Sequence, residues 1–405
     1  MCRPTVGWVR PRSFAAADRL PAVSTACRLW NRSQSGRSAM RYCMAEVNRS
    51  AIPFSERRRH LSRRQETTPM PVQSLAPRPL APEPLALVIG ATGAFGGEVA
   101  ERLVAARWRV RALHRDPDRA RAATGLAADW VAGDAMQKGD VLRAAEGVRV
   151  IVHGANPPGY RNWAGTVLPM MDNTIAAGIR EGARILVAGS VYNYGPDARG
   201  EIAEDAPQHP LTRKGRIRVE LERRLRQASQ EGAKTLVLRA GDFFGARANN
   251  SFMGRVIFQA GKPVRSLTYP GPLGVRHDWA YLPDLAETAV RLLEMEAELS
   301  ACASFHFRGH ALDGRELVAA FERVVGRKLP TRAFPWFALS AIGPFNETFR
   351  ELAEMRYLWR EAVVLDNRRL TAALGAEPHT PIDDALAATL RAVGCLEDEA
   401  AAQAA

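Results

Sequence analysis

The chain has 405 residues, of which 46% are hydrophobic, so its length allows one large domain or two smaller ones. Its formal net charge is +13, but residues 1–65 carry fourteen arginines against three acidic residues, so the other 340 residues hold only +2. A nucleic-acid-binding role would therefore rest on this head alone. The five cysteines include no CxxC pair, which argues against a cysteine zinc site or a disulfide framework and favours free thiols.

The segment 1–83 is rich in Arg, Ser and Pro and has no sustained helical or strand period, so we expect a disordered basic head and linker. Three interpretations stay open. The segment is a transit peptide, a nucleic-acid-binding arm centred on the arginines of 57–64, or upstream sequence translated from an early start codon, with Met70 as the natural start. No apolar run of about 18 residues occurs, so no transmembrane helix is expected. We expect a cytoplasmic protein that binds neither membranes nor metals.

A dinucleotide-binding pattern opens the rest of the chain. Residues 85–89 are a short apolar run, typical of a buried parallel strand, and the glycine-rich segment 90–97 follows. A helix is predicted from Glu98 to Ala106 and a second strand from Arg109 to Leu113. This order of strand, glycine turn, helix and strand is the context in which a glycine motif indicates dinucleotide binding.

The glycines of this turn have the spacing GxxGxxG, at Gly90, Gly93 and Gly96. The first permits a tight turn, the second lets the backbone approach the pyrophosphate, and the third lets helix and strand pack closely. Phosphate would then lie at the positive N-terminus of the helix. The predicted cofactor contacts of the turn are Gly90, Thr92, Gly93, Ala94, Phe95 and Gly96.

The end of the second strand selects the cofactor. NAD enzymes usually place an acidic residue there to bind the ribose hydroxyl. Here the sequence is Leu113-His114-Arg115-Asp116, and Arg115 could pair with a 2′-phosphate. We therefore predict NADP(H) rather than NAD(H), with His114 and Arg115 as contacts. In the alternative, Arg115 is a solvated loop residue and Asp116 binds the ribose.

Strand and helix patterns alternate from residue 85 to residue 240, which predicts an α/β fold with a doubly wound parallel Rossmann sheet. We expect the dinucleotide-binding domain at 84–242. A smaller mixed substrate-binding part at 243–395 is expected to be interleaved with the last Rossmann elements. A tail would follow at 396–405.

From residue 84 to residue 395 the chain resembles the short-chain dehydrogenase/reductase superfamily, in its extended or atypical branches. The segment GATGAFGG resembles the superfamily fingerprint. Later segments resemble it in the right order, at 131–134, 150–155, 185–190, 238–240, 278–284 and 364–394. The resemblance implies further cofactor contacts at Asp134 (beside the adenine), His153, Ala155 and Ala240.

The active-site pattern departs from that superfamily. Ser190 and Tyr194 resemble its S-x-x-x-Y-G, but the Tyr-x-x-x-Lys that should follow is replaced by Lys214 and Arg218. Arginine cannot transfer a proton, whereas a lysine can if its surroundings lower its pKa. The segment is similar to the isoflavone-reductase-like enzymes, which place a lysine at about this point. The resemblance thus implies Ser190, Lys214 and Arg218 as catalytic residues.

Two functions remain open from these residues. The chain is an NADPH-dependent reductase with Lys214 as acid and Ser190 orienting the substrate, or a catalytically inactive NADP-binding regulator or scaffold. In the structural alternatives Lys214 is a solvated helix residue and Ser190 only caps a turn. Tyr192 is a substitute acid, and Tyr194 is expected to be structural.

The predicted substrate is a small organic molecule, apolar or aromatic, and a homo-oligomer is compatible with the sequence. The resemblance places Tyr160, Trp163, Tyr192, Phe243, Phe244 and Arg276 around it. The aromatic run 334–337, with Phe345 and Phe349, is core, an oligomer surface or an apolar cap. His277 stands beside Asp278, but adjacent residues seldom face one another, so no catalytic dyad is predicted there.

Overall fold

The computed structural model describes residues 83–157, 162–248, 251–337, 339, 350 and 352–396. The predicted disordered head lies outside the described residues except for Glu83, as do Tyr160, Phe345 and Phe349. Within the described ranges, every helix is too short or too polar to span a bilayer.

A seven-stranded parallel sheet forms the centre of the fold, in the order β11-β7-β5-β4-β1-β2-β3. Its strands are β1 (Leu85–Ile89), β2 (Arg109–His114), β3 (Asp129–Ala132), β4 (Val150–His153), β5 (Arg184–Ser190), β7 (Lys234–Ala240) and β11 (Cys302–Phe307). The chain order reverses between β1 and β4, where sheets of this kind bind their ligands. The predicted doubly wound Rossmann sheet is confirmed.

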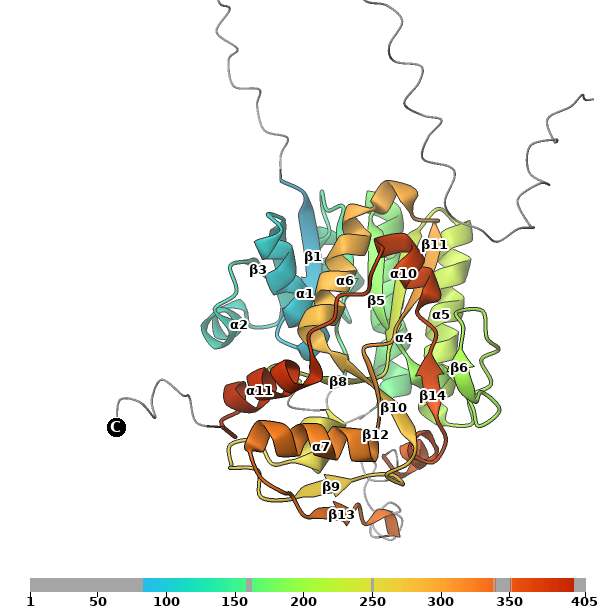
Figure 1. The fold of residues 1–405 in the computed structure, drawn as a ribbon. Coiled ribbons are helices and arrows are strands. Elements are labelled where there is room, and N and C mark those ends of the chain that lie inside the picture. Colours follow the sequence, from blue (N-terminus) through green and yellow to red (C-terminus); the bar gives the residue numbers. More distant parts are fainter. Residues whose placement is uncertain are drawn as a thin grey trace, which may run out of the picture. The chain divides into compact units, whose positions relative to one another are not determined.

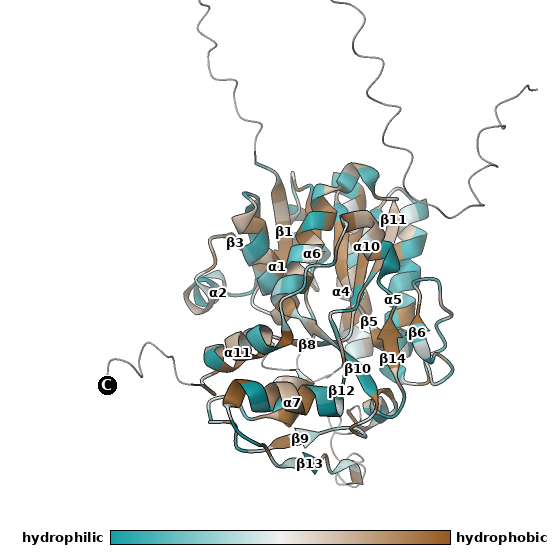
Figure 2. Cartoon of the chain, in the orientation of Figure 1, coloured by the Kyte–Doolittle hydropathy of each residue, from teal (hydrophilic) through white to brown (hydrophobic). Residues whose placement is uncertain are grey.

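Helices cover both faces of this sheet (Figure 1). One face carries α1 (Ala94–Ala105), α6 (Leu282–Glu294) and α10 (Arg368–Leu374), and α2 (Pro117–Thr124) lies beside β3. The other carries α3 (Lys138–Ala144), α4 (Trp163–Glu181) and α5 (Arg213–Gln230). Hydrophobic residues line the central strands and polar ones the outer helix surfaces (Figure 2), which is the pattern expected of strands buried on both faces.

The first helix begins earlier than the sequence predicts. It starts at Ala94 and not at Glu98, so Gly96 and Gly97 lie inside its first turn. A Cβ on Gly96 would stand 2.4 Å from the Gly90 carbonyl oxygen, and one on Gly97 would stand 2.8 Å from that of Ala91. The close packing of the helix on the glycine turn therefore explains these two glycines, which the sequence predicts to lie in a loop.

A second, mixed sheet lies at the carboxyl ends of the parallel strands (Figure 1). It contains β12 (His310–Asp313), β10 (Arg276–Tyr281), β14 (Val363–Leu365) and β6 (Gly200–Ile202), and β8 (Asp242–Phe244) pairs with β10. Around it lie α7 (Gly314–Val325), α11 (Ile382–Ala392) and the pair β9 (Leu267–Tyr269) and β13 (Thr331–Ala333). The chain passes back and forth between the two sheets. Strand β6 of the second sheet precedes β7 of the parallel sheet, and β11 of the parallel sheet follows β10 of the second.

The aromatic run 334–337 divides between core and surface. Trp336 is buried and its indole Nε1 donates to the Pro270 carbonyl at 2.5 Å, while the ring of Phe334 lies edge-on against it. Phe337 is 79% exposed. The core interpretation therefore holds for Trp336 and Phe334 and fails for Phe337.

Candidate cofactor and active site

The glycine turn after β1 closes on the end of β4. Gly90 has φ +91°, and a Cβ there would lie 2.6 Å from the backbone nitrogen of Ala155. Only glycine fits this conformation and this spacing. The turn is fixed by a hydrogen bond from the Gly93 N–H to the Gly90 carbonyl at 2.9 Å.

The N-terminus of α1 suits a phosphate. No side chain caps this helix end, and its first turn contains no acidic residue. By contrast, Asp116 caps α2 and Asp313 caps α7. The first N–H groups of an uncapped helix and its positive dipole end bind anions, so these residues fit the pyrophosphate of a dinucleotide. Thr92 is exposed beside this end, and Gly93 and Ala94 are half-buried.

The tip of β2 presents one exposed cation. Arg115 is exposed, while the Nδ1 atom of half-buried His114 accepts from the Asp116 N–H at 3.0 Å. The Asp116 carboxylate accepts from the Arg119 N–H at 3.1 Å and so caps α2. This acid is oriented toward its own helix.

The end of β3 places Asp134 in a tight turn. Its carboxylate accepts from the Met136 N–H at 2.9 Å, and its own N–H donates to Asp140 at 2.9 Å. That N–H holds the pKa of Asp140 below its usual value. Asp134 is half-buried and lies on the same sheet edge as the glycine turn.

The end of β4 carries a buried, uncharged histidine. The Nδ1 atom of His153 lies 2.8 Å from the hydroxyl oxygen of Thr174, whose own proton goes to the Met170 carbonyl. We therefore assign the proton of the imidazole to Nδ1. Burial, together with the positive charge of Arg218, lowers the pKa of His153 to about 4.

Ser190 and Ala240 lie opposite one another at the ends of β5 and β7. The half-buried Ser190 hydroxyl accepts from the Tyr192 N–H at 3.1 Å, so Ser190 does cap the turn η2 (Val191–Asn193). Tyr194 is fully buried and its hydroxyl lies 3.2 Å from Nε2 of His306, which agrees with the structural role expected of it.

Helix α5 carries Lys214 and Arg218, the residues that replace the Tyr-x-x-x-Lys motif, and it packs beside the Ser190 turn. Lys214 is fully buried, so the interpretation of a solvated lysine is wrong. Arg218, one turn further, is half-buried and its guanidinium lies 5.1 Å from the centre of the Trp163 ring. Between them, a Cβ on Gly215 would stand 2.3 Å from the Tyr192 carbonyl oxygen. The glycine therefore lets the helix start press against the Ser190 turn.

The predicted substrate residues are only partly brought together. Phe243 stacks on Phe95 of the glycine turn, with ring centres 6.5 Å apart and planes at 23°. Tyr192 lies on the Ser190 turn, is half-buried and packs against α5. Arg276 is exposed, donates to the Ala311 carbonyl at 3.2 Å and lies 3.8 Å from Glu316, so its contacts are with β12 and α7. Substrate roles for these residues stay predictions.

Two pairings between polar side chains could not be predicted from the sequence. His277 bonds Asp242 at 2.7 Å, not its neighbour Asp278, and its ring lies on that of Trp359 with centres 4.1 Å apart. Arg239 binds both carboxylate oxygens of Glu222 at 2.8 Å. Neither partner is adjacent in sequence, and no motif in the sequence signals the pairing.

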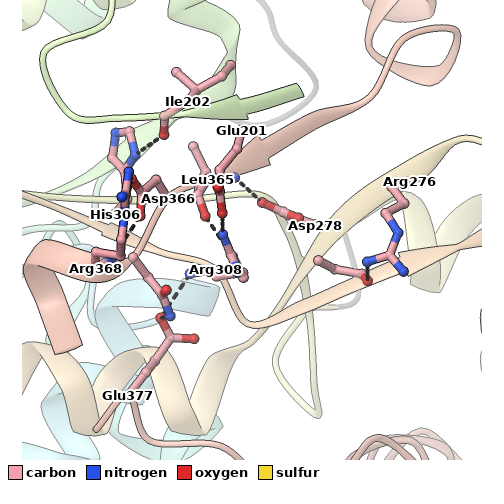
Figure 3. A network of polar contacts seen from close by, with 12 residues as sticks. Glu201, Ile202, Arg276, Asp278, His306, Arg308, Leu365, Asp366, Arg368 and Glu377 are labelled. Atoms are coloured by element: carbon pink, nitrogen blue, oxygen red, sulfur yellow. Dashed lines mark hydrogen bonds and ion pairs between the residues drawn. The ribbon is translucent and has the colours of Figure 1, made fainter. Parts of the chain in front are cut away.

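A separate polar network joins the second sheet to the parallel one (Figure 3). Glu377 accepts from the Arg308 and Gly309 N–H groups, and Arg308 donates to the Leu365 carbonyl and to Glu201. The network ties β6, β14 and the turn after β11 together. It thereby fixes the second sheet over the strand ends that carry Ser190 and Ala240.

A surface hollow of about 380 Å³ lies away from these residues. It is bounded by β2, β3 and α3, and its charged lining includes Arg111, Asp129, Asp140, Arg143 and Glu146. None of the glycine turn or of the strand ends at Ser190 and Ala240 lines it. This hollow is therefore separate from the candidate site residues at the carboxyl edge of the sheet.

Known proteins match this architecture. The profile of the NAD dependent epimerase/dehydratase family matches residues 86–301, more than half of the chain. Similar solved structures include MoeE5 in complex with UDP-glucose and NAD (19% identity, TM-score 0.60, 76% of this chain and 98% of that one). Another is UDP-glucuronic acid 4-epimerase from Bacillus cereus in complex with NAD (17% identity, TM-score 0.61, 76% and 98%). No functionally curated protein matches the sequence.

Proposed function

Because the chain belongs to the NAD dependent epimerase/dehydratase family, we propose that it is an NADPH-dependent reductase of a small organic substrate, with Lys214 as the acid. The observation that carries this proposal is the position of the buried Lys214 at the start of α5, beside the turn that follows Ser190. A lysine with no structural or chemical role would extend into water, because burying an amine is costly. Here it lies next to Gly215, which abuts the turn after Ser190.

NADP(H) is the proposed cofactor. Arg115 is exposed at the tip of β2 and supplies a guanidinium for a 2′-phosphate. The acid that would bind a free ribose hydroxyl, Asp116, is turned toward the N-terminus of α2. The pyrophosphate would lie at the N-terminus of α1, over Gly93 and Ala94.

Each residue of the proposed site has a separate role in the reduction of a carbonyl group. When bound along the glycine turn and the strand ends, NADPH would supply the hydride for this reduction. The ammonium of Lys214 would give its proton to the substrate oxygen, leaving an alcohol and a neutral amine that regains a proton before the next turnover. The Ser190 hydroxyl orients that oxygen. Arg218 cannot transfer a proton and contributes its fixed charge.

The proposed substrate is apolar or aromatic. Phe95 and Phe243 stack beside the glycine turn, and Tyr192 lies at the Ser190 turn. Aromatic side chains favour flat, weakly polar molecules. The similar solved structures include complexes with UDP-glucose and NAD and with UDP and NAD, so a nucleotide sugar is the competing substrate class.

A second candidate function is an NADP-binding regulator without turnover. The replacement of the superfamily's tyrosine by Lys214 favours it, since a phenol is the usual acid of this site. The two functions are separated by measuring NADPH consumption with a panel of ketones, enones and UDP-sugars. A parent chain that binds NADPH but consumes none with any of them would favour the regulator.

A cytoplasmic location is also proposed. The described cysteines, Cys302 and Cys395, are free thiols, as is usual in a reducing compartment.

A further inference from the structure

A buried ion pair lies beneath the proposed active site. Arg239 on β7 is 1% exposed, and its Nη2 atom donates to both carboxylate oxygens of Glu222 on α5 at 2.8 Å. The Nη1 atom of Arg239 donates to the carbonyl of Ser190 at the end of β5. One guanidinium thus joins three elements at the carboxyl edge of the sheet.

Glu222 is also bonded to the turn that follows Ser190. Its carboxylate accepts from the side-chain amide of Asn193 at 2.9 Å and from that of Gln208 at 3.1 Å. Asn193 is fully buried and belongs to the turn capped by Ser190. The turn is therefore held from both ends, at the Ser190 carbonyl through Arg239 and at Asn193 through Glu222.

Glu222 lies on the same helix as Lys214, the proposed acid, so the ion pair with Arg239 also affects where Lys214 lies. Lys214, Arg218 and Glu222 follow one another at intervals of four residues, so they lie along one face of the helix. Fixing Glu222 against Arg239 sets the rotation and depth of that face. The placement of Lys214 and Arg218 relative to Ser190 follows from it.

Packing alone does not account for this pair. Two charges removed from water are costly even when fully bonded, and apolar residues of similar size stabilise a core as well or better. The other charged or titratable groups around the pair are Tyr194, whose ring centre lies 5.2 Å from the guanidinium, His306, Glu204 and Arg226.

We propose that Glu222 and Arg239 are positioning residues, which hold the Ser190 turn and the Lys214–Arg218 face of α5 around the nicotinamide end of the cofactor. The proposal rests on the proposed function. Both side chains are nearly fully buried and their contacts are with the chain itself, so they act through the residues that they hold. The adenine and pyrophosphate end, at Arg115 and the glycine turn, lies on other strands.

The test compares two ligands on the full chain. NADPH carries the nicotinamide, whereas 2′-phospho-ADP-ribose has the same phosphates and adenine without it. Glu222→Gln keeps the shape and removes the charge, and we expect it to weaken NADPH binding by roughly ten- to hundred-fold, as for a lost charged hydrogen bond. Binding of 2′-phospho-ADP-ribose should change by less than about two-fold. Arg239→Lys should restore part of the NADPH affinity that Arg239→Met loses.

The matched control is Glu220→Gln, on the outer side of the same helix, where Glu220 pairs with Arg223 and Arg224. It should leave both affinities unchanged. Equal losses for both ligands in Glu222→Gln, with a lower melting temperature, would overturn the proposal in favour of a purely structural pair. Unchanged NADPH binding would overturn it too. A parent chain that binds NADPH but reduces nothing refutes only the reductase, whereas one that binds neither ligand refutes both proposals.

Discussion

A carboxyl oxygen of Asp278 on β10 accepts a hydrogen bond from the backbone N–H of Leu365 on β14 at 2.7 Å (Figure 3). Its other oxygen is buried and has no hydrogen-bond partner among the described residues. Burial raises the pKa of this carboxyl to about 8, and the charge of Glu377 adds to the effect. The strand pair is thus held by an acid that is protonated at neutral pH.

This geometry predicts a pH-dependent stability. The pKa of Asp278 is higher in the folded chain than in the unfolded one, so its contribution is complete below about pH 4 and is lost as pH rises through about 8. Asp278→Asn keeps an acceptor for Leu365 and cannot ionise. We expect its melting temperature to exceed that of the parent at about pH 8 and to match it at about pH 4. Parallel melting curves for parent and variant across this range would contradict the assignment.

Arg115→Ala tests the choice of cofactor. A guanidinium bound to a 2′-phosphate contributes about 1.5–3 kcal/mol, so the parent should bind NADPH roughly ten- to hundred-fold more tightly than NADH. The variant should lose most of that preference and keep its affinity for NADH, as measured by titration of cofactor fluorescence. Arg119→Ala, on the exposed side of α2, is the control and should change neither affinity. A parent that prefers NADH refutes the proposal.

Lys214→Met tests the acid. Methionine keeps the length of the side chain and removes the proton donor, so turnover should fall by roughly 10²–10⁴-fold while NADPH binding persists. Lys234→Met, at a half-exposed lysine paired with Glu296, is the control and should retain full activity. An active parent whose Lys214→Met variant keeps its turnover would transfer the role of acid to Tyr192.

Gly96→Ala tests the glycine turn. The new Cβ would stand 2.4 Å from the Gly90 carbonyl oxygen, so helix α1 or the turn must move. We expect cofactor binding to become too weak to measure by calorimetry. In Gly139→Ala the new Cβ would approach only the end of the Arg143 side chain, at 3.4 Å, so binding should be normal. Normal NADPH binding by Gly96→Ala would show that the turn does not hold the pyrophosphate.

Much of the Rossmann part could be predicted from local sequence. The run 85–89 is buried on both faces, and the contacts of Gly93 and Gly96 with Gly90 lie within a few residues, although Gly90 itself packs against the distant Gly154 and Ala155. The start of α1 could not be predicted, because glycines within a helix are indistinguishable from loop glycines until the partner backbone is known. Burial of Lys214 was equally hidden, since the sequence around it is basic and polar.

Pairings between distant residues were the main omission. His277 and Asp278 are adjacent on β10, so their side chains point to opposite faces, and each finds its partner elsewhere: Asp242 for one, Leu365 for the other. Arg239 and Glu222 belong to different elements and meet only when α5 packs on the sheet. Such pairs depend on the tertiary fold and leave no periodic pattern in the chain.

The strand β6 has a consequence for the order of folding. Residues 200–202 lie in the loop between Ser190 and Lys214, and they pair with residues 363–365, near the other end of the chain. Contacts so distant in sequence form late, because a long loop must close before they stabilise anything. During synthesis the strands of the glycine turn emerge long before β14 does. The dinucleotide turn can therefore form early, whereas β6 finds its partner strand only when the last part of the chain arrives.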